Sequence, residues 1–115
     1  MKQITGADLV GLAVSTAALA DTARPLVLDV REPWELALAA IAIDGLETRA
    51  MPMNSVPERC AGLDPAQPIV CICHHGVRSA QVAAFLERRG FEAVFNLAGG
   101  IEAWSTQIDA SVPRY

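Results

Sequence analysis

The residues best suited to chemistry form one short stretch from Cys73 to Ser79, with the sequence Cys-His-His-Gly-Val-Arg-Ser. It lies between a predicted strand and a predicted helix. The N-terminus of a helix presents unpaired backbone N–H groups and a positive dipole, which bind anions. The same environment favours the thiolate form of a cysteine. We therefore expect Cys73 to be a nucleophile that attacks an anionic substrate.

These features suit the transfer of a sulfur atom. The thiolate of Cys73 would attack an electrophilic sulfur in a small sulfur-containing anion or a persulfide donor, and would become a persulfide itself. Backbone N–H groups would stabilise the charged terminal sulfur. A thiol, cyanide or a protein acceptor, such as a partner in a sulfur relay, would then remove it, so that the reaction proceeds by covalent catalysis. This chemistry requires no metal and no organic cofactor.

Three side chains of this stretch could have more than one role. His74 and His75 are expected to line the mouth of the pocket, because ligands this close in sequence rarely surround one tetrahedral metal ion. Arg78 could contact the donor anion or brace the loop through a buried ion pair. The second role is favoured because Asp29 and Glu32 lie at the end of a neighbouring predicted strand.

The chain has three cysteines, which cannot all pair, so at least one thiol is free and a cytoplasmic location is expected. Cys71 lies inside an apolar run and is predicted to be a core thiol. Cys60 follows a predicted helix and is expected at the surface or half buried. Trp34 and Trp104 are both expected to be packing residues.

Alternating strand-like and helix-like segments must position these groups. The predicted strands cover residues 26–30, 68–72 and 93–97, with weaker candidates at 3–4 and 50–51. The predicted helices start near residues 6 and 33, cover 55–60 and 78–89, and follow the Gly-Gly pair at 99–100. Runs that are apolar at successive positions are typical of strands buried on both faces of a parallel sheet.

The composition fits one folded domain over residues 1–115. Hydrophobic residues make up 52% and charged residues 19%, which argues against disorder. The net charge is −4 and the basic residues are scattered, so no nucleic-acid partner is expected. No apolar run reaches the roughly 20 residues of a membrane span, and Asp8 interrupts the N-terminal region, so neither a membrane association nor a signal peptide is expected.

Several motifs, in order along the chain, resemble those of rhodanese-type sulfurtransferases. The stretch from Cys73 to Ser79 resembles the active loop, residues 28–32 the signature of the second strand, and residues 51–53 the segment after the third. Residues 90–104 resemble the C-terminal signature. Many relatives have a His-Ile pair where this chain has Ala-Ala-Ile at 39–41.

The resemblance implies an α/β, rhodanese-like three-layer domain with an approximately five-stranded, mainly parallel sheet flanked by helices. It implies that Cys73 carries the persulfide and that Asp29 and Arg31 support the loop. The backbone N–H groups that would cradle the sulfur belong to His74, His75, Gly76, Val77, Arg78 and Ser79.

The sequence alone is also compatible with two other functions. Cysteine phosphatases and arsenate reductases of a related fold have five residues between cysteine and arginine, whereas four separate Cys73 from Arg78. The shorter loop makes a smaller cradle, which favours sulfur over a tetrahedral oxyanion. A non-catalytic persulfide carrier or sulfide sensor would keep the same cysteine and loop.

Overall fold

Five strands form a single sheet in the computed structural model, which describes residues 1–115. The strands are β1 (Lys2–Ile4), β2 (Leu26–Asp29), β3 (Thr48–Ala50), β4 (Ile69–Ile72) and β5 (Val94–Leu97). Their order in the sheet is β1-β5-β4-β2-β3, and every neighbouring pair is parallel. The prediction of a five-stranded, mainly parallel sheet is therefore confirmed.

Two of the inner strands, β2 and β4, account for the continuous apolar runs in the sequence. Every residue of β2 and β4 is buried, which is the pattern expected when helices cover both faces of a sheet. The edge strands β1 and β3 contain exposed positions, and their signal in the sequence was correspondingly weaker.

Four α-helices connect successive strands, and a fifth follows the last strand. They are α1 (Gly6–Ser15), α2 (Pro33–Leu38), α3 (Val56–Arg59), α4 (Val77–Arg88) and α5 (Gly100–Gln107). Short 3-10 helices cover Asp21–Ala23, Met53–Ser55 and Cys60–Gly62. Thr5 caps α1 in a reciprocal pair of hydrogen bonds with Asp8, and Pro33 occupies the first turn of α2.

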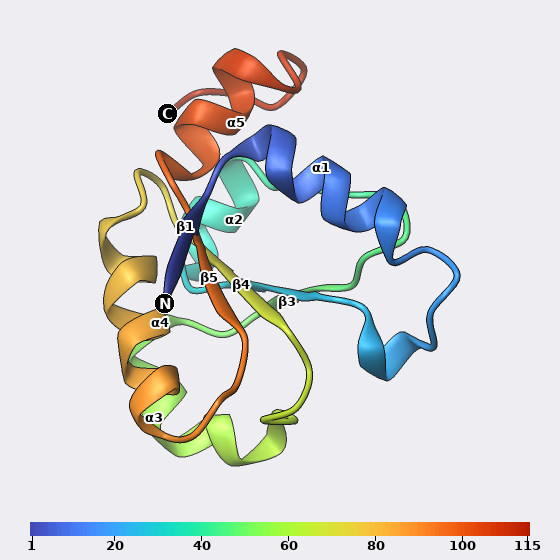
Figure 1. The fold of residues 1–115 in the computed structure, drawn as a ribbon. Helices are drawn as coiled ribbons and strands as arrows, with labels where there is room; N and C mark the ends of the chain where they lie inside the picture. Colours follow the sequence, from blue (N-terminus) through green and yellow to red (C-terminus); the bar gives the residue numbers. More distant parts are fainter.

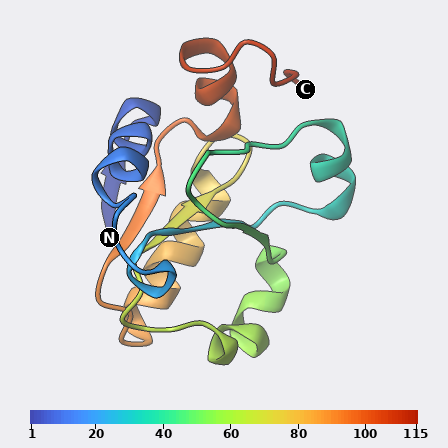
Figure 2. The same ribbon diagram turned by 90° about the vertical axis from the view of Figure 1, so that its right-hand side faces the viewer.

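The helices make two outer layers around the sheet (Figures 1 and 2). Helices α3 and α4 cover one face, and α1 and α5 cover the other. Each face encloses its own hydrophobic cluster. One includes Leu28, Cys71 and Leu86, and the other includes Val27 and Trp104.

Alternation along β4 decides which way the candidate nucleophile points. Ile69, Cys71 and Cys73 belong to the cluster beneath α3 and α4, whereas Val70 and Ile72 belong to the opposite cluster. Successive side chains of a strand point to opposite faces. Cys73 therefore continues the face that α4 covers.

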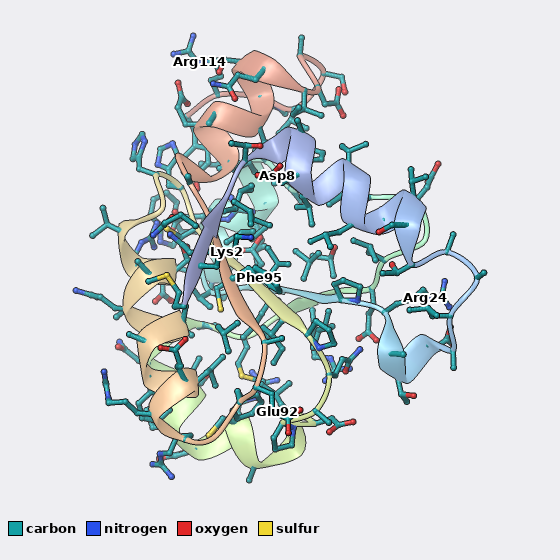
Figure 3. All side chains as sticks on the ribbon, in the orientation of Figure 1. Lys2, Asp8, Arg24, Glu92, Phe95 and Arg114 are labelled. Carbon is teal, nitrogen blue, oxygen red and sulfur yellow. The ribbon has the colours of Figure 1, made fainter.

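The first and last strands lie side by side. Lys2 of β1 pairs with Phe95 of β5, and Ile4 pairs with Leu97. Figure 3 shows the labelled Lys2 and Phe95 next to each other. This pairing places the N-terminal residues beside the segment that leads from β5 into α5, where the backbone N–H of Ala98 donates to the carbonyl oxygen of Ile4.

Two predictions about individual side chains are wrong. Cys60 is buried rather than at the surface or half buried, because the turn from α3 into the next 3-10 helix packs it into the core. Trp34 is 63% exposed, because α2 presents it outward at its N-terminal end. Trp104 and Cys71 are buried, as predicted.

The helices are all short, and none has both the length and the apolar character needed to cross a membrane.

Candidate active site

Cys73 follows β4 directly, and its side chain is held inside the loop that starts α4. The residue is 1% exposed. Its Sγ accepts hydrogen bonds from the backbone N–H of Gly76 at 3.1 Å and of Ser79 at 3.4 Å, and the Ser79 hydroxyl oxygen lies 3.2 Å away. Of the six residues expected to cradle the sulfur, Gly76 and Ser79 contact it in this structure.

Gly76 makes the tight loop possible. It is the N-cap of α4 and has a φ of 96°, a conformation that side chains with a Cβ rarely adopt. The chain can therefore turn back over Cys73 before the helix begins. Val77, the next residue, is 68% exposed and lies on the outside of the loop.

The N-terminus of α5 fixes the other side of the loop. The backbone N–H of Ile101 donates to the carbonyl oxygen of Cys73 at 2.9 Å, and that of Glu102 donates to the carbonyl of His74 at 3.1 Å. A Cβ on Gly100 would lie 2.5 Å from both of these oxygens. The Gly-Gly pair is thus a helix-entry turn, as predicted, and it also allows close contact between α5 and the loop.

Arg78 forms an ion pair across the site with Glu35 of α2. Its two terminal nitrogens lie 2.6 and 2.8 Å from the two carboxylate oxygens. An ion pair was expected, but with Asp29 or Glu32. Glu35 takes this role because it lies one helical turn inside α2, where its side chain is buried and turned toward α4.

The charges of this pair reinforce each other. Hydrogen bonds from Arg78 hold the pKa of Glu35 at about 2, well below its usual value. Hydrogen bonds to Glu35 raise the pKa of Arg78 in turn. Both groups are therefore charged at neutral pH, and the carboxylate balances the positive charge of the guanidinium.

Asp29 and Arg31 form a second, fully buried ion pair. The guanidinium of Arg31 contacts both carboxylate oxygens of Asp29 at 2.8 to 3.2 Å. It also donates to the carbonyl oxygens of Glu35, inside α2, and of Ala39, the C-cap of α2. The pair thus holds α2, the helix that carries Glu35.

Tyr115 joins the two ion pairs. Its hydroxyl accepts a hydrogen bond from Arg31 at 2.9 Å and donates one to Glu35 at 2.7 Å. Its ring stacks on His74 with a centroid separation of 3.8 Å. Figure 1 shows the C-terminal end of the chain beside the loop that enters α4. Sequence reasoning missed both Glu35 and Tyr115.

The two histidines form an aromatic stack at the outside of the loop. His74 stacks on His75 at 3.9 Å as well as on Tyr115. Burial, and then the neighbouring His75, lower the pKa of His74. His74 is therefore neutral at pH 7, and its Nε2, which is 3.9 Å from Glu102, forms no ion pair there. No group of three or more His, Cys, Asp or Glu side chains is arranged to hold a metal ion.

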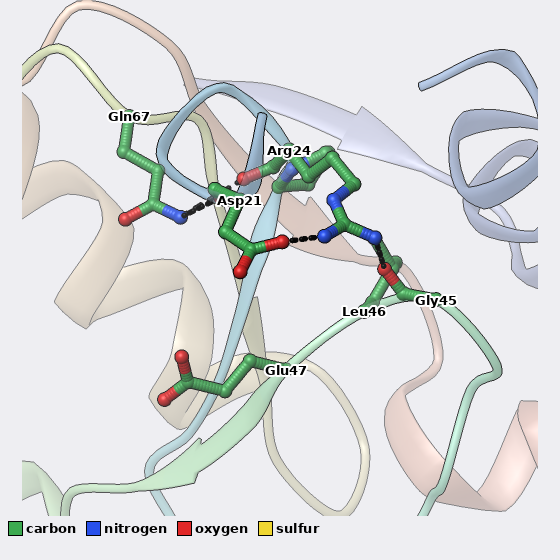
Figure 4. A pocket seen from close by; sticks show the side chains of 7 residues that line it. Asp21, Arg24, Gly45, Leu46, Glu47 and Gln67 are labelled. Atoms are coloured by element: carbon green, nitrogen blue, oxygen red, sulfur yellow. Dashed lines mark hydrogen bonds and ion pairs between the residues drawn. The ribbon is translucent and has the colours of Figure 1, made fainter. Parts of the chain in front are cut away.

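A polar cavity of about 360 Å³ lies at the opposite end of the sheet, where β2, β3 and β4 begin (Figure 4). Arg24, Glu47 and Gln67 line it, and they lie one or two positions before the first residues of β2, β3 and β4. The guanidinium of Arg24 is already bound by Asp21 and by the carbonyl of Gly45. The cavity is thus far from Cys73, which follows the opposite end of β4. The positive charge of Arg24 is balanced by Asp21.

The ion pair of Glu35 predicts a defined loss of stability in acid. A depressed pKa contributes stability above the unfolded-state value near 4.5, and this contribution is lost as the pH falls toward the folded value of about 2. Between these limits, the free energy of unfolding should fall more in the wild type than in Glu35→Gln. The extra loss over the whole interval should reach up to about 3 kcal/mol. Urea unfolding from pH 5 to pH 2 measures this, and parallel profiles would contradict it.

The model of the rhodanese-like domain family matches residues 13–107. A protein named sulfurtransferase from Allochromatium vinosum is 39% identical over 87 residues, which cover 76% of this chain and 78% of that protein. Thiosulfate sulfurtransferase GlpE of Stutzerimonas stutzeri is 33% identical over 82 residues, which cover 71% of this chain and 72% of that protein.

Longer proteins contain similar domains. The chain is 34% identical over 93 residues to the chloroplastic rhodanese-like/PpiC domain-containing protein 12 of Arabidopsis thaliana. The match covers 77% of this chain but 30% of that protein.

The fold itself is similar to solved structures. The crystal structure of a rhodanese-like domain protein from Staphylococcus aureus covers 100% of this chain and 99% of its own, with a TM-score of 0.74 and 26% identity. The family match spans most of the chain, and the sheet agrees with it. The chain belongs to the family of rhodanese-like domains.

Proposed function

We propose that this protein is a sulfurtransferase that moves a sulfane sulfur from thiosulfate or a persulfide to a thiophilic acceptor through a persulfide on Cys73. The observation that carries the proposal is the position of the Cys73 sulfur, which two backbone N–H groups at the start of α4 contact directly. Relatives named sulfurtransferase and thiosulfate sulfurtransferase support the same reaction class.

The first half of the reaction loads the cysteine. The thiolate of Cys73 attacks the outer sulfur of thiosulfate and forms a new S–S bond. The S–S bond of thiosulfate breaks, and sulfite leaves with its electron pair. The product is a persulfide whose terminal sulfur is negatively charged, and the N–H groups of Gly76 and Ser79 with the dipole of α4 stabilise charge in this loop.

The second half discharges the cysteine. Cyanide, a thiolate or a persulfide-accepting partner protein attacks the terminal sulfur. The S–S bond to Cys73 breaks, and the cysteine leaves as the thiolate, ready for another cycle. No oxidant or reductant is consumed, because both steps are displacements at sulfur.

The geometry of Arg78 favours sulfur over phosphate as the substrate element. Both terminal nitrogens of its guanidinium are engaged by Glu35, so Arg78 braces the loop rather than presenting a free fork to an oxyanion. Four residues separate it from Cys73, one fewer than in cysteine phosphatases. A dedicated persulfide carrier would share this geometry, and slow turnover would identify it.

The three free thiols suit the reducing cytoplasm.

The test is the mass of the intact protein after incubation with thiosulfate and, in parallel, with a small-molecule persulfide. We expect the wild type to gain one sulfur atom, and cyanide to remove it with the release of thiocyanate. Cys73→Ala should gain none. Cys71→Ala is the matched control and should load normally, because burial raises the pKa of Cys71 to about 12 and keeps it a neutral thiol.

Failure of the wild type to load from either donor would overturn the proposal. Efficient hydrolysis of an aryl phosphate that depends on Cys73 would also overturn it, in favour of a phosphatase.

A further inference from the structure

A second polar group lies against the sulfur of Cys73, behind the loop. The Ser79 hydroxyl oxygen is 3.2 Å from Sγ and makes a short hydrogen bond with Oδ1 of Asn96 on β5. Ser79 is 0% exposed and Asn96 is 1% exposed, so water does not compete at either site. The hydroxyl has one proton and two neighbours, and only one of them can receive it.

The orientation of the Asn96 amide decides which neighbour receives the proton. Its Nδ2 donates to the carbonyl oxygen of Gly76 at 3.0 Å and to Oε1 of Gln3 at 2.9 Å. A backbone carbonyl can only accept, so the amide nitrogen must face Gly76 and the amide oxygen must face Ser79. Since that oxygen also can only accept, the proton of Ser79 points toward Asn96.

The other side of the Ser79 oxygen, with its lone pairs, then faces Cys73. This arrangement suits a neutral thiol, whose S–H can donate to the serine oxygen. For a thiolate it supplies no donor beyond the backbone N–H groups of Gly76 and Ser79. The Ser79 proton can help a charged sulfur only by turning away from Asn96 and giving up that hydrogen bond.

We infer that Asn96 is a positioning residue that directs the Ser79 hydroxyl proton away from Cys73 and so restrains formation of the thiolate in the resting site. The inference rests on the proposed role of Cys73 as the nucleophile. Asn96 acts through Ser79 and does not contact the sulfur itself. It thereby limits the reactivity of Cys73 toward adventitious electrophiles.

The charged and titratable groups around the sulfur do not oppose this role. Arg78 on α4 interacts with Cys73, but its charge is balanced by Glu35 on α2. Cys71, the thiol that precedes it on the same face of β4, stays neutral because burial raises its pKa. The direction of the Ser79 proton is therefore a separate control on the sulfur.

The test is the pH dependence of Cys73 alkylation by iodoacetamide, because the thiolate is the reactive form. We expect Asn96→Leu, which keeps the shape of the side chain, to move the midpoint of the profile about one pH unit lower. A hydrogen bond to a charged group supports a change of this size. Alkylation on the rising limb should then be about tenfold faster than in the wild type. Asn96→Ala should move it in the same direction.

A double-mutant comparison separates this effect from a general loosening of the loop. In a Ser79→Ala background, Asn96→Leu should no longer shift the midpoint. Easier access of the reagent would raise the maximal rate at high pH instead of moving the midpoint. Gln3→Ala removes one partner of Asn96 but leaves its contacts with Gly76 and Ser79, so its profile should match the wild type.

An unchanged or higher midpoint in both Asn96 variants would overturn the inference, as would a shift that persists without Ser79. Alkylation requires no sulfur transfer. Its outcome therefore stands apart from the thiosulfate experiment, and a failure of one can be told from a failure of the other.

Discussion

Alanine in place of Gly100 should lower the free energy of unfolding by about 3 kcal/mol or more and should abolish loading of Cys73 with sulfur. The added Cβ would lie 2.5 Å from the backbone oxygens of Cys73 and His74, and neither oxygen can rotate away as a side chain would. The residue also has a φ of 59°. Backbone strain and overpacking each cost about 1 to 3 kcal/mol. Urea unfolding and intact-protein mass measure the two effects.

Gly90→Ala is the matched control for this variant. Gly90 has a φ of 92° as the turn after α4, but a Cβ there would meet no atom within 4 Å. It should cost only the conformational strain, about 1 to 2 kcal/mol, and it should leave sulfur loading intact. Equal losses in the two variants would show that the contact between α5 and the loop has no special importance.

Arg31→Met should destabilise the protein by about 3 to 5 kcal/mol. The substitution leaves the carboxylate of Asp29, which is 1% exposed, without its cation, and an uncompensated buried charge costs this much. It also frees the carbonyls of Glu35 and Ala39 and one side of the Tyr115 hydroxyl. Thermal and urea unfolding at pH 7 measure the loss.

The chain contains its own control for this ion pair. Arg49 pairs with Glu47, again two positions apart in the sequence, but its side chain is 40% exposed and that of Glu47 is 59% exposed. Arg49→Met should cost no more than about 1 kcal/mol, because solvent screens an exposed pair. Similar losses for the two arginines would refute the importance of burial.

Features that depend on local sequence could be predicted. The central strands were readable because burial on both faces leaves every position apolar, and α4 was readable because Gly76 and Gly90 mark its two ends. The position of Cys73 between strand and helix follows from the same local order. Periodicity and turn residues were enough to place the loop.

Contacts between distant segments could not be predicted. Arg78 contacts a carboxylate 43 residues away, and the hydroxyl of Tyr115 meets Arg31 across 84 residues. Glu35 is one of several acidic residues near the end of β2, and only the turn of α2 selects it over Asp29 and Glu32. The errors at Cys60 and Trp34 have the same origin, because the facing of a short helix depends on what it packs against.

The position of β1 beside β5 has a consequence for how the protein is made. Residues 2–4 leave the ribosome long before their strand partner at 94–97. The side chain of Gln3 likewise cannot form its hydrogen bond with Asn96 until Asn96 has been synthesised. Asn96 in turn bonds Ser79, whose hydroxyl lies against the nucleophile. A nascent chain can therefore complete neither its sheet nor the back of its reactive loop until synthesis has passed β5, and such non-local pairing slows folding. Assembly of the site therefore has to follow the synthesis of β5.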